Sequence, residues 1–168
     1  MTEKISYIEI DLSRCSEVYS VGACAASIPA TGTIQCFNCF ATCQDKTNYN
    51  KEIVTSRHST ASGDLPFDID AIPDIKSISI KAAKLDLGES MGQRASISVT
   101  FGDGRYPDTG PEGDRYLADR DYDPYTVGTY WGKFRARYPF TQGADIRLIR
   151  GDSNQTLAQM ETRHFIVD

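Results

Sequence analysis

The sequence contains no continuous run of about 18 apolar residues, the length that a membrane-spanning helix requires. Its first ten residues alternate polar and apolar side chains and lack the apolar segment of a secretory signal peptide. Basic residues are not in excess either, and a formal net charge of -5 argues against a general nucleic-acid-binding protein. We therefore expect a chain that folds in a cytoplasm, has no membrane span and does not bind nucleic acid directly.

Cysteine is absent after position 43, yet the first 43 residues contain five cysteines. A reducing cytoplasm disfavours structural disulfides. An odd number of cysteines would also leave one thiol over in a scheme of disulfides alone. The clustering therefore indicates metal or redox chemistry at Cys15, Cys24, Cys36, Cys39 and Cys43.

The rest of the composition is typical of one folded domain. A chain of 168 residues with 40% hydrophobic and 24% charged residues can bury a substantial core. We expect residues 1–168 to form a single domain, with 13–50 as a cysteine-rich loop region and 51–168 as a β-rich body. An apolar strand pattern continues almost to Asp168, which is typical of an N-terminal piece of a longer chain.

Alternation of apolar and polar residues predicts short strands over much of the chain. The clearest strand covers residues 94–101, in which Ala95, Ile97 and Val99 share one face. Further strands are expected at residues 5–12, 52–59, 75–87, 144–150 and 162–167. The pattern predicts a mainly β (α+β) fold, either a small β-barrel or a sandwich-like domain.

One helix is predicted near residues 124–138, within this β-rich body. Asp123 can cap its N-terminus, and Pro124 suits the first helical position. Pro139 would end the helix because proline cannot continue the backbone hydrogen-bond pattern. The apolar stripe of the helix would consist of Val127, Tyr130, Trp131, Phe134 and Tyr138.

The cysteine spacing leaves three interpretations open. Cys36 and Cys39 form a Cys-x-x-Cys pair typical of zinc sites, but Cys15 and Cys24 do not form the second tight pair of a zinc ribbon. A [4Fe–4S] cluster also needs four thiolates, and it tolerates wide and irregular spacing because it is a larger object. Unconnected buried cysteines are disfavoured because all five lie within one polar segment. Spacing alone does not decide between zinc and an iron–sulfur cluster.

Motifs along nearly the whole chain carry a family resemblance. They include Gly22-Ala-Cys24, Thr31-Gly-Thr33 before Cys36-Phe-Asn38, Ala41-Thr-Cys43-Gln-Asp45, Gly92-Gln-Arg-Ala-Ser96, Asp121-Tyr-Asp-Pro124, Gly128-Thr-Tyr-Trp-Gly-Lys-Phe134 and Met160-Glu-Thr-Arg-His164. In this order they resemble the tail tip and baseplate hub proteins, a minor tail protein family of siphophages and prophages. The resemblance implies a structural protein of the virion tail tip that is assembled in the host bacterial cytoplasm.

The cysteine region is similar to the C-terminal domain of tail tip protein L of phage lambda, which holds a [4Fe–4S] cluster. The match lies in the steps from Cys15 to Cys24 and from Cys36 to Cys43. The similarity implies that these four cysteines bind the iron of the cluster, with Cys39 as the reserve candidate. The family further implies a homotrimer or ring, with a distal tail ring above it and hub or fibre proteins below.

A cytosolic zinc- or iron–sulfur-dependent enzyme domain is the alternative function. The two histidines of the chain, His58 and His164, have no recognisable catalytic motif beside them. We therefore expect a protein that is not an enzyme and has no catalytic residues.

Overall fold

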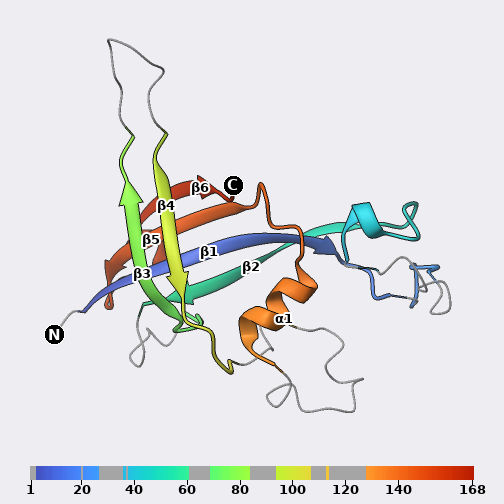
Figure 1. Ribbon diagram of the computed structural model, residues 1–168, viewed down its shortest axis with the longest axis horizontal. Coiled ribbons are helices and arrows are strands. Elements are labelled where there is room, and N and C mark those ends of the chain that lie inside the picture. Colours follow the sequence, from blue (N-terminus) through green and yellow to red (C-terminus); the bar gives the residue numbers. More distant parts are fainter. Residues whose placement is uncertain are drawn as a thin grey trace, which may run out of the picture. The chain divides into compact units, whose positions relative to one another are not determined.

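A computed structural model gives the positions of residues 3–19, 21–26, 36, 38–60, 69–83, 94–106, 113 and 128–168. Within these residues, six strands form two antiparallel sheets, and one α-helix accompanies them. The larger sheet has the strand order β2-β1-β5-β6, and the smaller sheet pairs β3 with β4 (Figure 1). The expected mainly β fold is confirmed, and the described residues form no closed barrel.

The larger sheet combines strands from both ends of the chain. Near the start of β1, the Ser6 carbonyl accepts a hydrogen bond from the Thr60 N–H. Just past the end of β1, the Ser16 N–H donates to the Asn50 carbonyl, so β1 and β2 run antiparallel. The strands of this sheet are β1 (Lys4–Cys15), β2 (Lys51–Ser59), β5 (Asp145–Asp152) and β6 (Glu161–Ile166).

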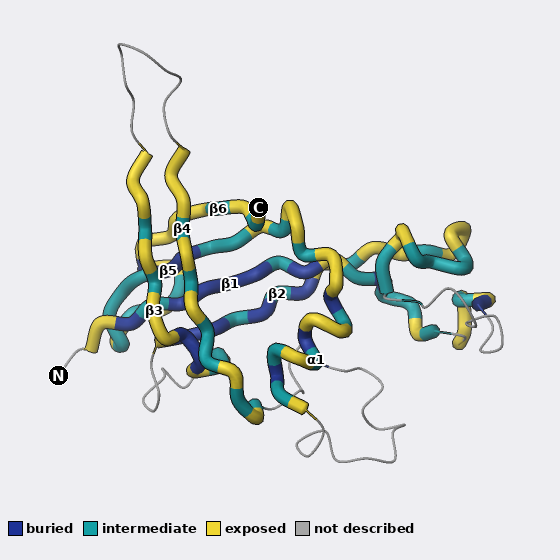
Figure 2. Tube along the Cα trace, viewed as in Figure 1, coloured by how far each residue is buried: buried dark blue, intermediate teal, exposed yellow. Residues whose placement is uncertain are grey.

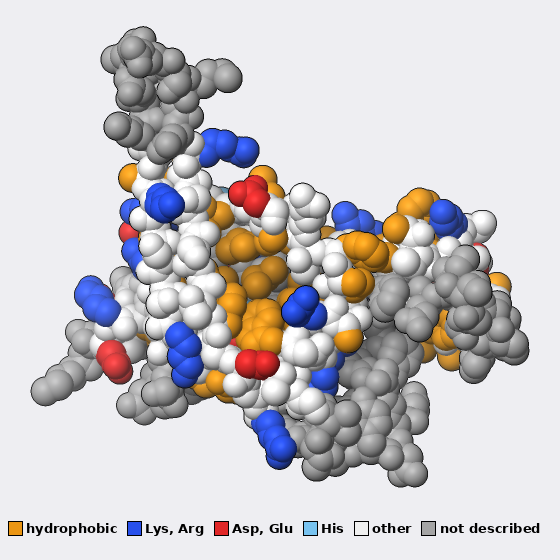
Figure 3. All heavy atoms as spheres, in the orientation of Figure 1, with side chains coloured by type: hydrophobic (Ala, Val, Ile, Leu, Met, Phe, Trp, Pro, Cys, Tyr) orange, Lys and Arg blue, Asp and Glu red, His pale blue; other side chains and the backbone are white. Residues whose placement is uncertain are grey.

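The smaller sheet consists of β3 (Ile75–Lys81) and β4 (Ser96–Phe101). Apolar residues face each other across the pair, as Ile78 lies opposite Val99. The intervening positions are exposed serine, threonine and lysine residues, so this face is mostly white with some blue in Figure 3. The strand expected over residues 75–87 ends earlier than predicted, with irregular backbone at 82–83, and residues 84–87 lie outside the described part.

The helix α1 (Tyr130–Arg137) begins later than the sequence pattern predicted. Gly128 has a positive φ of 75° and Thr129 is extended, so neither residue continues a helix from Pro124. The Thr129 side chain instead accepts a hydrogen bond from the first turn and caps the helix. The prediction of one continuous helix over residues 124–138 is therefore wrong, and the expected start at Asp123 and Pro124 lies outside the described residues.

The chain divides into two compact units that alternate along the sequence. Unit 1 comprises Met1–Glu9, Arg57–Gly104 and Asp145–Val167. Unit 2 comprises Ile10–Ser56, Arg105–Ala144 and Asp168. The sequence predicted one domain, with a cysteine-rich loop region at residues 13–50 and a β-rich body at 51–168. These boundaries differ from those of the two compact units, and the predicted division stays a prediction. No described helix is long and apolar enough to cross a membrane.

Unit 1 contains a conventional apolar core. Leu157, in the short 3-10 helix η4 (Leu157–Gln159), and Ala71 pack against it. Beside this core, Glu9 bridges two arginines of neighbouring strands: Arg57 Nη2 is 2.7 Å from Glu9 Oε1, and Arg147 Nε is 2.7 Å from Glu9 Oε2. The core residues are Ile5, Tyr7, Ile69, Ile149 and Met160.

One face of α1 is buried in unit 2. Tyr130 and Phe134 lie one turn apart and are buried, and Tyr138 continues the same stripe. The Tyr130 hydroxyl lies 3.2 Å from the Ser56 hydroxyl of β2 within a hydrogen bond. Of the predicted stripe, Tyr130, Phe134 and Tyr138 are thus buried and Trp131 is half-buried, while Val127 lies outside the described residues.

Candidate metal centre

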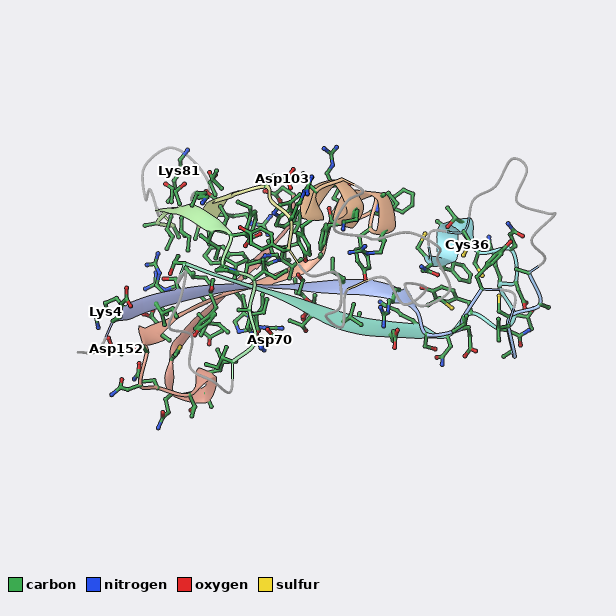
Figure 4. All side chains as sticks on the ribbon, turned by 90° about the horizontal axis from the view of Figure 1, so that it is seen from below. Lys4, Cys36, Asp70, Lys81, Asp103 and Asp152 are labelled. Atoms are coloured by element: carbon green, nitrogen blue, oxygen red, sulfur yellow. The ribbon has the colours of Figure 1, made fainter. Side chains whose placement is uncertain are left out.

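All five cysteines lie in unit 2, in the chain that connects β1 to β2. Cys15 is the last residue of β1, and a short 3-10 helix, η2 (Phe40–Thr42), lies between Cys39 and Cys43. All five are free thiols; Cys15 is buried and the other four are partly exposed. Figure 4 shows Cys36 beside η2, with further sulfur atoms in the neighbouring loops.

The described residues of this part of the chain include few buried apolar side chains. Among the described residues of 13–50, only Cys15 and Ala26 are buried. Large apolar side chains point outward instead, as the exposed fractions of 53% for Phe40 and 60% for Val21 show. Figure 2 shows the contrast between the dark blue of β1 and the teal and yellow of the loops after it. Burial of apolar surface therefore contributes little to the order of these loops.

The structure brings four of the thiols into electrostatic reach of one another. Burial raises the pKa of the Cys36 thiol, and the thiols of Cys43, Cys24 and Cys15 raise it further. Burial also raises the pKa of Cys43, and repulsion from Cys15 and Cys24 adds to that rise. These four are the residues that the family resemblance implies as cluster ligands.

Two of these thiols accept hydrogen bonds from the backbone. The Asn38 N–H donates to the Cys36 sulfur, and the Asp45 N–H donates to the Cys43 sulfur. Each bond opposes the rise in the thiol pKa because it stabilises the thiolate. In both cases the donor lies two residues after the cysteine. Such hydrogen bonds favour the thiolate, the form of cysteine that binds metals.

Asn38 and Asp45 also contact the segments that carry the other two thiols, Cys15 and Cys24. The Asn38 carbonyl accepts a hydrogen bond of 2.6 Å from the Cys15 N–H, and Asn38 has a left-handed φ of 56°. The Asp45 Oδ2 atom accepts a bond of 2.7 Å from the N–H of Ala25, the neighbour of Cys24.

Asp45 also holds its own turn. Its Oδ2 atom accepts a second bond of 2.8 Å from Asn48 Nδ2. The Asn48 side chain and then the Ala25 N–H lower the pKa of Asp45, since both donate to its charged form. The carboxylate is therefore the form that joins these two segments.

Cys39 stands apart from the four-thiol group. Its sulfur lies 3.1 Å from the Thr42 hydroxyl, within the turn that it caps. It is not among the thiols that raise the pKa of Cys36 or Cys43. The Cys36-x-x-Cys39 pair of the zinc interpretation stays a prediction.

The donor set has the chemistry that an iron–sulfur cluster requires. Thiolates are soft ligands that bind zinc and iron–sulfur clusters, and backbone donors supply the hydrogen bonds that cluster sulfur atoms receive. In the described part of the chain, no group of three or more His, Cys, Asp or Glu side chains is arranged to hold a metal ion.

Unit 1 contains a buried pair of polar side chains that the sequence pattern did not predict. His58 Nδ1 lies 2.9 Å from Asp74 Oδ1, and both side chains are fully buried. The His58 ring also packs against Phe101, with 5.0 Å between the ring centroids. No motif links His58 to an acid 16 residues away, so only the fold reveals the pair. His164, by contrast, is exposed in β6.

Comparison with known proteins leaves the site to be interpreted from its own residues. The interpretation of the site therefore rests on the arrangement of these residues and on the family resemblance of the sequence motifs. The chain matched no protein-family model, no curated protein and no solved structure.

Proposed function

We propose that this chain is a structural component of a bacteriophage tail tip or baseplate hub, stabilised by a [4Fe–4S] cluster. Cys15, Cys24, Cys36 and Cys43 would hold the cluster. One observation carries the proposal: these four thiols gather in a segment whose described residues bury almost no apolar side chains. When bound, the cluster would cross-link three successive loops, and its binding free energy would add to the free energy of folding.

The family resemblance favours a cluster over a zinc ion. Zinc holds four thiolates at about 2.3 Å each, which requires all four sulfur atoms around one point. A cluster spreads its four thiolates over separate iron corners, so it suits a wider group. The similarity of the cysteine steps to a known cluster domain supports the same choice.

The virion role rests on the family resemblance and agrees with the chemistry of the chain. A structural cluster replaces an apolar core, which is useful in loops that must keep a fixed shape at an assembly interface. The partners would be the distal tail ring above and the hub or fibre proteins below, with this chain as a homotrimer or ring. The net charge of -5 supports protein partners over direct contact with nucleic acid.

Virions offer a direct test of this role. In the phage or prophage that encodes the chain, an antibody against the chain should label one end of the tail in electron micrographs. Cys36→Ser should abolish tail assembly, whereas Cys39→Ser should leave tails intact. Label that is absent from virions, or intact tails after replacement of all four ligand cysteines, would contradict the proposal.

A further inference from the structure

Two turns of the candidate metal centre share one construction. In each turn, a residue two positions after a ligand cysteine donates its backbone N–H to that cysteine. The same residue then accepts a hydrogen bond from a second ligand loop. Asn38 accepts with its carbonyl and Asp45 with its carboxylate.

We propose that Asn38 and Asp45 are positioning residues, each of which holds two of the four thiols as a pair. Asn38 joins Cys36 to Cys15, and Asp45 joins Cys43 to the loop of Cys24. The inference rests on the proposed function, in that the four thiols bind a cluster. It adds that the protein, and not the cluster alone, sets the spacing within each pair.

Asn38 can do this because of its backbone conformation. With φ at 56°, its N–H is directed to the Cys36 sulfur while its carbonyl is directed to Cys15 N. Glycine adopts this conformation freely, and asparagine does so more readily than most residues. Alanine does so at a cost because its Cβ meets the backbone. The role therefore depends on the backbone, and the side chain only permits it.

Asp45 works through one atom of its side chain. Both the Ala25 N–H and the Asn48 side chain donate to Oδ2. An amide oxygen also has two acceptor sites, so asparagine at this position can accept both bonds without the charge. Alanine can accept neither. The pair of variants Asp45→Asn and Asp45→Ala thus separates the hydrogen bonds from the charge.

The first experiment compares Asn38→Gly with Asn38→Ala in the full chain loaded with the cluster under anaerobic conditions. Both changes remove the same side chain and differ mainly in their tolerance of positive φ. We expect Asn38→Gly to release iron to a chelator at the wild-type rate. Asn38→Ala should release it roughly 10- to 100-fold faster, the usual effect of losing an outer-shell partner. Equal rates for the two variants would overturn the role of Asn38.

Asn38→Ser keeps this test decisive if the alanine variant is insoluble. Serine is not among the residues enriched at positive φ, so Asn38→Ser should release iron faster than Asn38→Gly. A rate for Asn38→Ser no faster than that of Asn38→Gly would also contradict the inference.

The second experiment compares Asp45→Asn with Asp45→Ala by the same measurement. Both variants lack the charge, so any difference between them reports the two hydrogen bonds. We expect faster iron release from Asp45→Ala, again by roughly 10- to 100-fold, and a near wild-type rate from Asp45→Asn. Equal rates for the two would show that Asp45 does not position the thiols.

The outcomes also separate this inference from the proposed function. Wild-type protein without iron and sulfide would contradict the cluster itself. In that case the same variants, loaded with zinc, would test the thiol pairs through zinc release. Wild-type protein with a full cluster, together with variants that all match it, would retain the proposed function and overturn the positioning roles.

Discussion

Unit 1 and the cysteine loops of unit 2 are ordered in different ways. In unit 1, apolar side chains such as Tyr7 and Ile149 pack into a cluster, and the buried His58–Asp74 pair lies within the same unit. Among the described residues from the end of β1 to β2, only Cys15 and Ala26 are buried, and the contacts include hydrogen bonds, neighbouring thiols and the exposed Phe40 ring against Tyr49. Unit 1 therefore has an apolar core, whereas the proposed function assigns the order of the second region to what its thiols bind.

The largest expected effect comes from the ligand cysteines. Cys24→Ser should remove the cluster and the order of the loops, because the cross-link supplies the folding free energy that apolar burial does not. Hydrogen exchange should speed up for amides of residues 38–50 and change little for amides of β5. Unchanged exchange at residues 38–50 would show that the loops are ordered without the cluster.

In unit 1, removal of a buried apolar side chain should lower stability without changing the iron content. Ile149 is buried in the core cluster, so Ile149→Ala should lower the free energy of unfolding by about 2–5 kcal/mol. Iron content per folded chain should stay the same. Ile166, which is 56% exposed in β6, provides the control, since Ile166→Ala should have little effect. Equal losses of stability in a urea titration would contradict this account of the core.

The buried polar pair should have a smaller effect. Asp74→Ala removes the hydrogen bond between the Asp74 carboxylate and His58 Nδ1, which should cost about 1–3 kcal/mol in a fully buried site. Asp70 is exposed and offers a matched control, in which Asp70→Ala should be near neutral. If Asp74→Ala proved as mild as the control, the pair would have no structural role in unit 1.

Cys39 should give the smallest effect of all. Its sulfur is paired with the Thr42 hydroxyl, and serine can replace it in that hydrogen bond. Cys39→Ser should therefore keep the visible absorption of the cluster and the iron content of wild type. Loss of the colour in this variant would make Cys39 a ligand and would require a new ligand set.

The sequence predicted the strands well because they follow a simple period. β4 shows alternating exposure from Ser96 to Phe101, as the alternation of its residues predicted. The start of α1 was predicted wrongly because Asp123 and Pro124 have the residue types of a helix start, as does the Thr129 cap. The helix begins after Thr129, and Gly128 before it has a positive φ. A sequence pattern does not show these backbone conformations.

The candidate site shows the same limit more strongly. Spacing located the cysteines but left zinc and iron–sulfur chemistry open, and only the resemblance singled out four of them. The contacts of Asn38 and Asp45 were missed, although both lie two residues after a ligand cysteine. Their position relative to these cysteines could have indicated a role for both residues. Their contacts with Cys15 and Ala25 could not have been predicted, since they join separate loops.

The central claim is that the four thiols bind a cluster that replaces an apolar core. Iron and acid-labile sulfide analysis of freshly purified, anaerobic protein tests it most directly. We predict brown protein with about four iron and four sulfide per chain and broad absorption in the visible blue. Colourless protein with one zinc per chain would contradict the claim and favour a zinc-dependent enzyme domain, and protein without metal would contradict it entirely.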